Sequence, residues 1–399
     1  MDTKNEEEFL KNMSYQRFPN RERNVPEIDI KQISPDKPLA VTVVFLVVIG
    51  LMMIFSASAQ KCIDMGVGPL KFFIQQLLGV IAGVAGMYFL SNKDYKKMRQ
   101  YTFPFVCGVI FLLILVKLVG TTVNGAQRWL YIGPLNLQPA ELAKPAVVFL
   151  MAGAFYKNAK IFTKQKFLLA YLPILIMVGF IFIQPNLSMV LLLLATSITL
   201  YLAAGGLWQL IVGVGAPGIV FLLLHGLRDY QSSRIMTWLH PEADPLGAGY
   251  NILQSLVAIA SGGFMGVGYG NAKQKLAWLP EAHTDFIFSV YAEEMGFVGC
   301  LLLICLFWSF LQRGVIIASK CTDMYGKLLA LGITFSICFQ GFLNMWVASS
   351  FVPATGVPMP FISYGGTSIM VSLWMVGILF NISKENEKKI RMQYNVRYM

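Results

Sequence analysis

The sequence predicts an all-α polytopic membrane protein of about ten transmembrane helices, with one large extracytoplasmic loop between helices seven and eight. Of 399 residues, 56% are apolar and only 13% are charged, and the mean hydropathy is +0.60. Soluble domains are far more polar. Apolar runs of about 20 residues recur, a length that crosses a hydrocarbon core roughly 30 Å thick. Helices are expected because a spanning backbone must satisfy its own hydrogen bonds and no alternating barrel pattern is present.

The expected spans divide the chain into two tails and one membrane domain. A polar tail covers residues 1–38, the transmembrane domain covers 39–383, and a basic tail covers 384–399. The first span follows a tail of mixed charge, so no cleaved signal peptide is expected. In chain order we expect spans near 39–57, 72–90, 101–119, 140–157, 167–184, 187–204, 207–226, 285–312, 327–350 and 366–383.

The distribution of positive charge predicts the orientation of these spans. If the N-terminus is inside, the inside connections and the C-terminal tail carry sixteen Lys or Arg, against seven in the much longer outside connections. The positive-inside rule therefore places both termini in the cytoplasm and the connections after spans three and seven outside the cytoplasmic membrane. The net charge of +11 is spread over short loops, which argues against a nucleic-acid partner. Six cysteines, most of them in apolar runs, indicate neither a disulfide framework nor a metal site.

The extracytoplasmic loop 227–284 is the longest connection, and connections of that length usually have a function. Its middle, "YNILQSLVAIASGG", is apolar for about ten residues only, which is too short to span and favours a re-entrant or interfacial helix.

The segment "EAHTDF" ends this loop and holds the first candidate site. Asp285 is expected at the outer mouth of span eight, with Glu293 and Glu294 two turns deeper, where ionisable groups are costly and usually paired or functional. Partial burial raises the pKa of a carboxylate towards the range useful to a general base. Alternatively, Thr284 or Asp285 caps the helix. His283 fits a polar neighbour better than a metal ligand, since no second ligand lies at a suitable spacing.

A second constellation lies in "NGAQRWLYIGPLNLQPAELAKP". Arg128 and Trp129 belong to a short outside loop, while Glu141 and Lys144 share one face of span four and are expected to form an internal ion pair. That pair is a structural lock or part of a functional site. Arg128, with Lys275 on the same side of the membrane, could neutralise a phosphorylated headgroup.

Two glycine-rich segments follow. "GGFMGVGYGNAKQK" resembles a phosphate cradle but lacks the P-loop pattern, so no nucleotide is expected, and a backbone nest for a lipid-linked pyrophosphate is the remaining ligand hypothesis. "VPATGVPMPFISYGGTS" carries no charge and is either a rigid turn that lines a groove or only a loop.

These motifs together resemble the SEDS family of shape, elongation, division and sporulation proteins, which includes FtsW, RodA and SpoVE. The resemblance covers residues 39–383 and rests on "NGAQRW", "QPAELAK", "DPLGAGYNILQS", "GGFMGVGYGN", "LPEAHTDFIF", "AEEMGFVG" and "PFISYGGTS". It implies a peptidoglycan glycosyltransferase that polymerises lipid II on the outer face of the cytoplasmic membrane.

The resemblance also implies roles for individual residues. Asp285 is the catalytic base that takes a proton from the acceptor sugar, and a cationic group or a divalent cation, Mg²⁺ or Mn²⁺, stabilises the leaving pyrophosphate. Implied partners are lipid II, glycan linked to undecaprenyl pyrophosphate, a class B penicillin-binding protein acting as transpeptidase, and other divisome proteins. The implied substrate-binding residues are Arg128, Trp129, Gln254, Lys275, Glu281 and His283, with Glu141 and Lys144 as the intramembrane pair.

The chain departs from the family pattern at "QPNLS", where Asn186 and Ser188 replace the usual acid and glycine, and at "GYN", where Asn251 replaces glutamine. "LPEAHTDFIF" and the long polar N-terminal tail look more like FtsW than RodA, which favours septal wall synthesis. The alternatives are a RodA-type elongation polymerase, a lipid II flippase and a scaffold for a penicillin-binding protein. The outer position of the polar motifs favours an enzyme over a transporter with a midplane site.

Overall fold

The computed structural model describes residues 34–123, 126–132, 135–156, 164–206, 229–276 and 278–398. By their contacts, residues 34–386 form one compact unit, to which the residues from 387 on do not belong. The predicted tail 1–38 therefore falls almost entirely outside the described residues, as does the predicted span 207–226.

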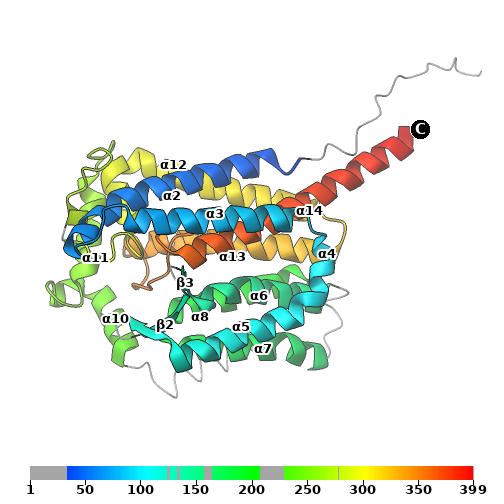
Figure 1. The fold of residues 1–399 in the computed structure, drawn as a ribbon, viewed down its shortest axis with the longest axis horizontal. Helices are drawn as coiled ribbons and strands as arrows, with labels where there is room; N and C mark the ends of the chain where they lie inside the picture. The colour runs from blue at the N-terminus through cyan, green and yellow to red at the C-terminus, as the bar shows by residue number, and fades with distance from the viewer. Residues whose placement is uncertain are drawn as a thin grey trace, which may run out of the picture. The chain divides into compact units, whose positions relative to one another are not determined.

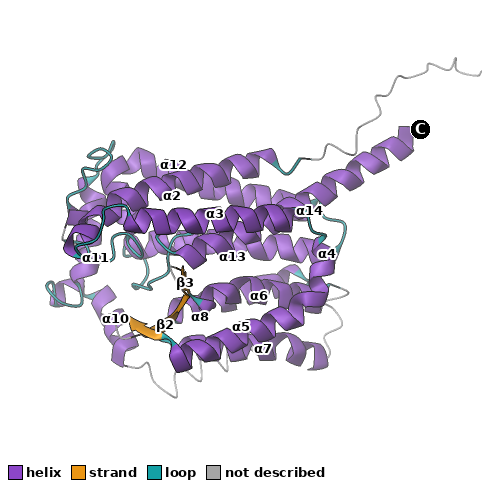
Figure 2. Ribbon diagram, viewed as in Figure 1, coloured by secondary structure: helices purple, strands orange, loops and turns teal. Residues whose placement is uncertain are grey.

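Helices dominate the described chain (Figure 2). The α-helices are α2 (Lys37–Asp64), α3 (Lys71–Ser91), α4 (Tyr95–Met98), α5 (Thr102–Val119), α6 (Pro139–Phe155), α7 (Lys164–Ile183), α8 (Leu187–Ala203), α10 (Asp229–Leu239), α11 (Tyr250–Ser261), α12 (Ile287–Ser319), α13 (Met324–Ala348) and α14 (Gly366–Tyr398). The described residues also form three short 3₁₀ helices, η1 (Arg99–Tyr101), η2 (Pro241–Ala243) and η3 (Gln274–Leu276).

The predicted spans that fall within the described residues each coincide with a helix. Among those residues, six helices are long and apolar enough to cross a membrane: Lys37–Asp64, Lys71–Ser91, Tyr95–Val119, Ile287–Ser319, Met324–Ala348 and Gly366–Gln393. Helix α11 occupies the apolar middle of the long loop and has only 12 residues, about 18 Å at 1.5 Å per residue. It is a helix too short to span, as the sequence predicted.

The long helices of the 34–386 unit run alongside one another (Figure 1). Helix α13 is central, since it packs against α12, α6 and α8, while α12 also packs against α2. Small residues allow close approach: a Cβ on Gly83 of α3 would lie 2.6 Å from Leu373 of α14, and one on Gly79 would lie 3.1 Å from the Gly366 backbone. Such contacts are typical of helices packed within a membrane.

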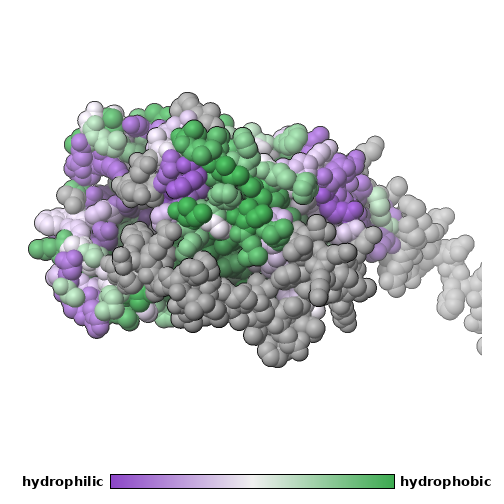
Figure 3. Space-filling view, turned by 90° about the horizontal axis from the view of Figure 1, so that it is seen from below, coloured by the Kyte–Doolittle hydropathy of each residue, from purple (hydrophilic) through white to green (hydrophobic). Residues whose placement is uncertain are grey.

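Large apolar side chains cover the outside of several helices. Val44 and Phe45 on α2, and Phe103 and Phe111 on α5, are each more than half exposed. On the face shown in Figure 3, hydrophobic residues gather between two more hydrophilic ends. This distribution suits a protein whose middle is surrounded by lipid.

One small sheet departs from the all-helical prediction. Strands β1 (Thr121–Val123), β2 (Ala126–Ile132) and β3 (Leu135–Leu137) form an antiparallel sheet in the order β1-β2-β3, with Thr121 opposite Trp129 and Leu130 opposite Leu137. The predicted outside loop that carries Arg128 is therefore an ordered ribbon between α5 and α6.

Candidate active site

Asp285 lies in a turn directly before α12, which begins at Ile287, two residues later than the predicted span. The N-cap residue of α12 is Phe286, and no side chain caps the helix. The Thr284 hydroxyl instead donates to the Glu281 carboxylate, at 2.9 Å. The interpretation of Asp285 as a helix cap is therefore wrong, and its carboxyl group is left for another role.

Three consecutive carbonyls hold this turn in place. The carbonyls of residues 283, 284 and 285 precede the helix, so they have no partner within it. Each accepts a hydrogen bond from a segment far along the chain: His283 from the Tyr364 N–H (2.9 Å), Thr284 from the Ser363 hydroxyl (2.6 Å) and Asp285 from the Asn344 amide (2.9 Å). The position of Asp285 is thus determined by α13 and by the turn before α14.

The carboxyl group of Asp285 has an unusual acidity. Burial raises its pKa from 3.8 to about 6, and the negative charge of Glu281 acts in the same direction, while Arg128, Arg234 and Lys61 oppose the shift. A carboxylate with a pKa near the operating pH can both accept and release a proton, as a general base must.

The three cations around Asp285 come from three separate elements. Arg128 on β2 donates from Nε to the Gln184 carbonyl at 2.9 Å. Arg234 on α10 donates to the Ala354 carbonyl, also at 2.9 Å, and Lys61 in the last turn of α2 forms an ion pair with Glu281 at 3.3 Å. Only Arg128 was predicted as a site residue. Lys61 and Arg234 stand in the sequence as isolated charges of outside connections, with no local motif to mark them.

Glu281 and His283 flank Asp285 but differ in access. Glu281 is half-buried; burial raises its pKa, but the charge of Lys61 and the hydrogen bond from Thr284 help to hold it below the ordinary value. His283 is only 3% exposed and packs between Phe72 and Tyr364 at ring distances of 5.2 and 5.7 Å. Burial lowers the pKa of His283 to about 4, so at neutral pH it is an uncharged packing residue. The predicted contact of His283 with substrate does not suit this burial.

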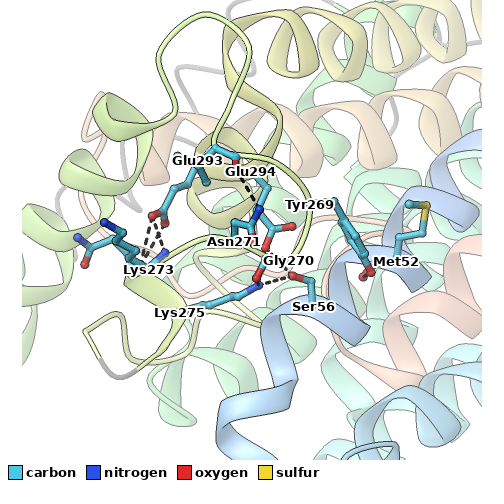
Figure 4. Close-up of polar contacts among 11 residues, drawn as sticks. Met52, Ser56, Tyr269, Gly270, Asn271, Lys273, Lys275, Glu293 and Glu294 are labelled. Atoms are coloured by element: carbon cyan, nitrogen blue, oxygen red, sulfur yellow. Dashed lines mark hydrogen bonds and ion pairs between the residues drawn. The ribbon is translucent and has the colours of Figure 1, made fainter.

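Lys275, predicted to bind phosphate, is engaged elsewhere (Figure 4). Its ammonium is buried and contacts the Glu294 carboxylate at 2.6 Å, the Ser56 hydroxyl at 2.6 Å and the Gly270 carbonyl at 2.8 Å. The structure therefore corrects its role to that of a buried ion pair joining α2, α12 and the glycine-rich loop.

The glycine-rich loop, residues 262–270, forms hydrogen bonds with the backbone of α12 where that helix is interrupted. Gly296 has φ 64° and ψ −166°, which interrupts the helix, and the loop backbone pairs with the interrupted turn. Val267 N–H donates to the Glu293 carbonyl at 3.0 Å, and Phe297 N–H donates to the Gly263 carbonyl at 2.9 Å. The N–H of Gly268 likewise donates to Glu294, at 3.1 Å. The N–H groups of Val267 and Gly268 already satisfy helix carbonyls, so these two donors do not form a phosphate nest, and a nest elsewhere in the loop stays a prediction.

The predicted intramembrane ion pair is confirmed. Glu141 and Lys144 on α6 are 0% and 1% exposed, and their charged atoms are 2.5 Å apart. The Lys144 ammonium also donates to Gln340 on α13, at 2.7 Å. Of the other predicted residues, Trp129 lies partly buried on β2 and Gln254 partly buried on α11.

Two of the three residues that depart from the family pattern, Asn186 and Ser188, have structural roles here. The Asn186 side chain accepts from the Met189 N–H at 3.3 Å and caps α8. The Ser188 hydroxyl donates to the Thr355 carbonyl at 2.5 Å, in the uncharged segment before α14. That segment is therefore more than a connection, since side chains of other elements hold it against the site.

In the described part of the chain, no group of three or more His, Cys, Asp or Glu side chains converges. Protein side chains alone therefore do not form a metal site there. Mg²⁺ commonly uses one or two carboxylates together with substrate phosphates. Asp285 and Glu281 could supply these one or two carboxylates. The binding of a divalent cation stays a prediction.

Known proteins with similar sequences cover nearly the whole chain. The FtsW, RodA and SpoVE family, described as cell cycle proteins, matches residues 37–388. The probable peptidoglycan glycosyltransferase FtsW of Trichlorobacter lovleyi is 38% identical over 355 residues, covering 87% of this chain and 93% of that protein. Stage V sporulation protein E of Bacillus subtilis is 36% identical over 364 residues, covering 89% and 98%.

Solved structures of similar fold point to the same family. A chain from a peptidoglycan synthase complex, described as coordinating polymerization and crosslinking, superposes with a TM-score of 0.74 at 28% identity, covering 88% of this chain and 98% of that one. The rod-shape-determining protein RodA of Thermus thermophilus gives a TM-score of 0.67 at 26% identity, covering 89% and 99%. The chain therefore belongs to the FtsW, RodA and SpoVE family of polytopic membrane proteins.

Proposed function

We propose that this chain is a peptidoglycan glycosyltransferase that polymerises lipid II into β-1,4-linked glycan at the outer face of the cytoplasmic membrane, with both termini in the cytoplasm. The observation that carries the proposal is the Asp285 carboxyl group, partly buried, with its pKa raised to about 6 and with three cations acting on it. A base and a cluster of positive charge are what sugar transfer from a pyrophosphate requires.

The reaction uses these groups as follows. Asp285 takes the proton of the acceptor 4-hydroxyl as its oxygen bonds to the anomeric carbon of the donor. The bond from that carbon to the pyrophosphate oxygen breaks, and undecaprenyl pyrophosphate leaves with the electron pair. A single displacement converts the α-linked donor into a β bond. Arg128, Arg234 and Lys61 stabilise the charge that develops on the leaving group.

The deciding experiment uses purified protein with its partner and labelled lipid II. The wild type is expected to form glycan polymer, and Asp285→Asn is expected to lower the rate by at least about 100-fold, within the 10²–10⁴ range of general-base catalysis. Asp64→Asn, which alters an exposed carboxylate at the end of α2, is the matched control and should keep wild-type activity. Polymer formation by a folded Asp285→Asn protein would refute the base assignment.

A second candidate function is lipid II transport. The interruption of α12 at Gly296 favours it, because transporters commonly use discontinuous helices. If the wild type forms no polymer but moves lipid II across vesicle membranes, transport is the correct function. A chelator in the same assay tests the predicted Mg²⁺ or Mn²⁺.

The partner and the cellular role follow from similarity. Resemblance to a chain of a peptidoglycan synthase complex supports a class B penicillin-binding protein as transpeptidase partner. Several relatives named FtsW, at 36 to 38% identity over most of the chain, support septal synthesis with divisome proteins. Depletion from its native cells should give filaments without septa, whereas an elongation enzyme would give rounded cells.

A further inference from the structure

Four carbonyls of one short segment are bound by side chains from three helices. The segment is residues 354–358, here called the clasped loop, and it precedes the turn to α14. The hydrogen bonds run from Arg234 to Ala354 (2.9 Å), from Ser188 to Thr355 (2.5 Å), from Asn344 to Val357 (2.8 Å) and from Gln340 to Pro358 (2.7 Å). A loop without charges is thus held by its backbone.

Asn344 connects the clasped loop to Asp285. Its side chain is 1% exposed, and its amide nitrogen donates both to the Val357 carbonyl and to the Asp285 carbonyl, at 2.8 and 2.9 Å. Carbonyl oxygens only accept hydrogen bonds, so the amide nitrogen must face both. One buried side chain therefore fixes the spacing between the loop and the backbone of the proposed base.

The loop also lies against the Asp285 carboxyl group itself. Gly356 has φ +69°, and a Cβ built there would lie 3.3 Å from the Asp285 Oδ2 atom. The two residues that follow Gly356 are the ones that Asn344 and Gln340 hold. Movement of the loop would let water reach the carboxylate, whose burial is the main cause of its raised pKa.

Gln340 extends this connection into the membrane domain. It stands one helical turn before Asn344 on α13, so both side chains lie on one face. Its amide nitrogen donates to Pro358, and its amide oxygen accepts from the Lys144 ammonium at 2.7 Å. Through these two amides, the buried Glu141–Lys144 pair of α6 is joined to the loop that covers Asp285.

We propose that Asn344 is a positioning residue for Asp285, and that Gln340 couples the Glu141–Lys144 ion pair to the same loop. This rests on the proposed function, in which Asp285 is the base. It gives the intramembrane ion pair a role in catalysis without contact with substrate.

The test compares variants of α13 in the lipid II polymerisation assay. Asn344→Leu keeps the size but removes both donors, and should lower kcat by about 10- to 100-fold, as misplacement of a catalytic group by about 1 Å does, with KM for lipid II changed less than about threefold. The acidic limb of the pH profile should move to lower pH as Asp285 becomes more solvated. Thr334→Val is the control, because buried Thr334 on α13 bonds only the Ala330 carbonyl of its own helix among the contacts described.

A second variant covers the case in which Asn344→Leu does not fold. Gln340→Met keeps the length of the side chain, adds no charge and loses the donor to Pro358, and it should lower kcat and shift the acidic limb in the same direction. Wild-type kcat and pH profile in the folded variants, with Asp285→Asn inactive, would overturn the positioning role and leave the proposed function standing. An active Asp285→Asn would overturn both.

Discussion

Asp285 is surrounded by charges of both signs, and their balance sets the pH at which it can accept a proton. Burial and Glu281 raise its pKa to about 6, and Lys61 is among the cations that lower it. Because a general base acts in its deprotonated form, the polymerisation rate should rise with pH through about 6 and level off above that value.

Two substitutions should move this acidic limb in opposite directions. Glu281→Gln removes a like charge, lowers the pKa of Asp285 and moves the limb to lower pH. Lys61→Met removes a favourable charge, raises that pKa and moves the limb to higher pH. The measurement is kcat against pH in the lipid II assay, with the exposed Asp64→Asn as control. Shifts in the same direction would show that Glu281 and Lys61 act through structure and not through charge.

The element that most constrains the fold near the site is α12, together with the glycine-rich loop that completes it. A helix interrupted within a membrane leaves backbone groups that lipid cannot satisfy. The loop supplies those partners, and Gly262 and Gly266 allow the backbones to approach so closely that a Cβ on either would lie 2.1 Å from a carbonyl oxygen of α12. Glycines are required here for contact with the helix.

Matched glycine substitutions separate that contact from backbone conformation. Gly266→Ala and Gly270→Ala both place alanine at positive φ, +81° and +83°, but only Gly266 faces α12, while nothing lies within 4 Å of a Cβ on Gly270. Gly270→Ala should cost about 1 to 2 kcal/mol, and Gly266→Ala roughly 1 to 3 kcal/mol more. Thermal unfolding in detergent measures the difference. Equal losses would mean that the loop does not pack on α12 in solution.

At the scale of the whole molecule, the proposed reaction requires the site to face outward. The excess of Lys and Arg in the predicted inside connections favours that orientation. Two exposed positions can be used to measure the orientation: Glu242 in the long loop and Asn92 after α3. With the six native cysteines replaced by alanine, Glu242→Cys should react with a membrane-impermeant maleimide in intact cells, and Asn92→Cys only after permeabilisation. The reverse pattern would place the site inside.

The membrane class and the helices were predictable from the sequence because they depend on local properties, whereas Asp285 was named as the catalytic base only through the resemblance to a family. Apolar runs set helix positions to within a few residues, and spacing of three placed Glu141 and Lys144 on one face of α6. Lys275 was assigned to phosphate binding because it follows a glycine-rich segment and lies on the same predicted side of the membrane as Arg128. In space its neighbours are Glu294 and Ser56, which no local pattern indicates.

By itself, the sequence determined that the chain is helical, spans a membrane and carries an acidic turn before α12. Only the tertiary structure decided what surrounds that turn. Arg128, Arg234 and Lys61 lie far apart in the chain, and their charges act together on Asp285 only because folding brings parts of β2, α10 and α2 near the same turn. The acidity of a carboxyl group depends on burial and on charges a few ångströms away, and those distances exist only after the chain has folded.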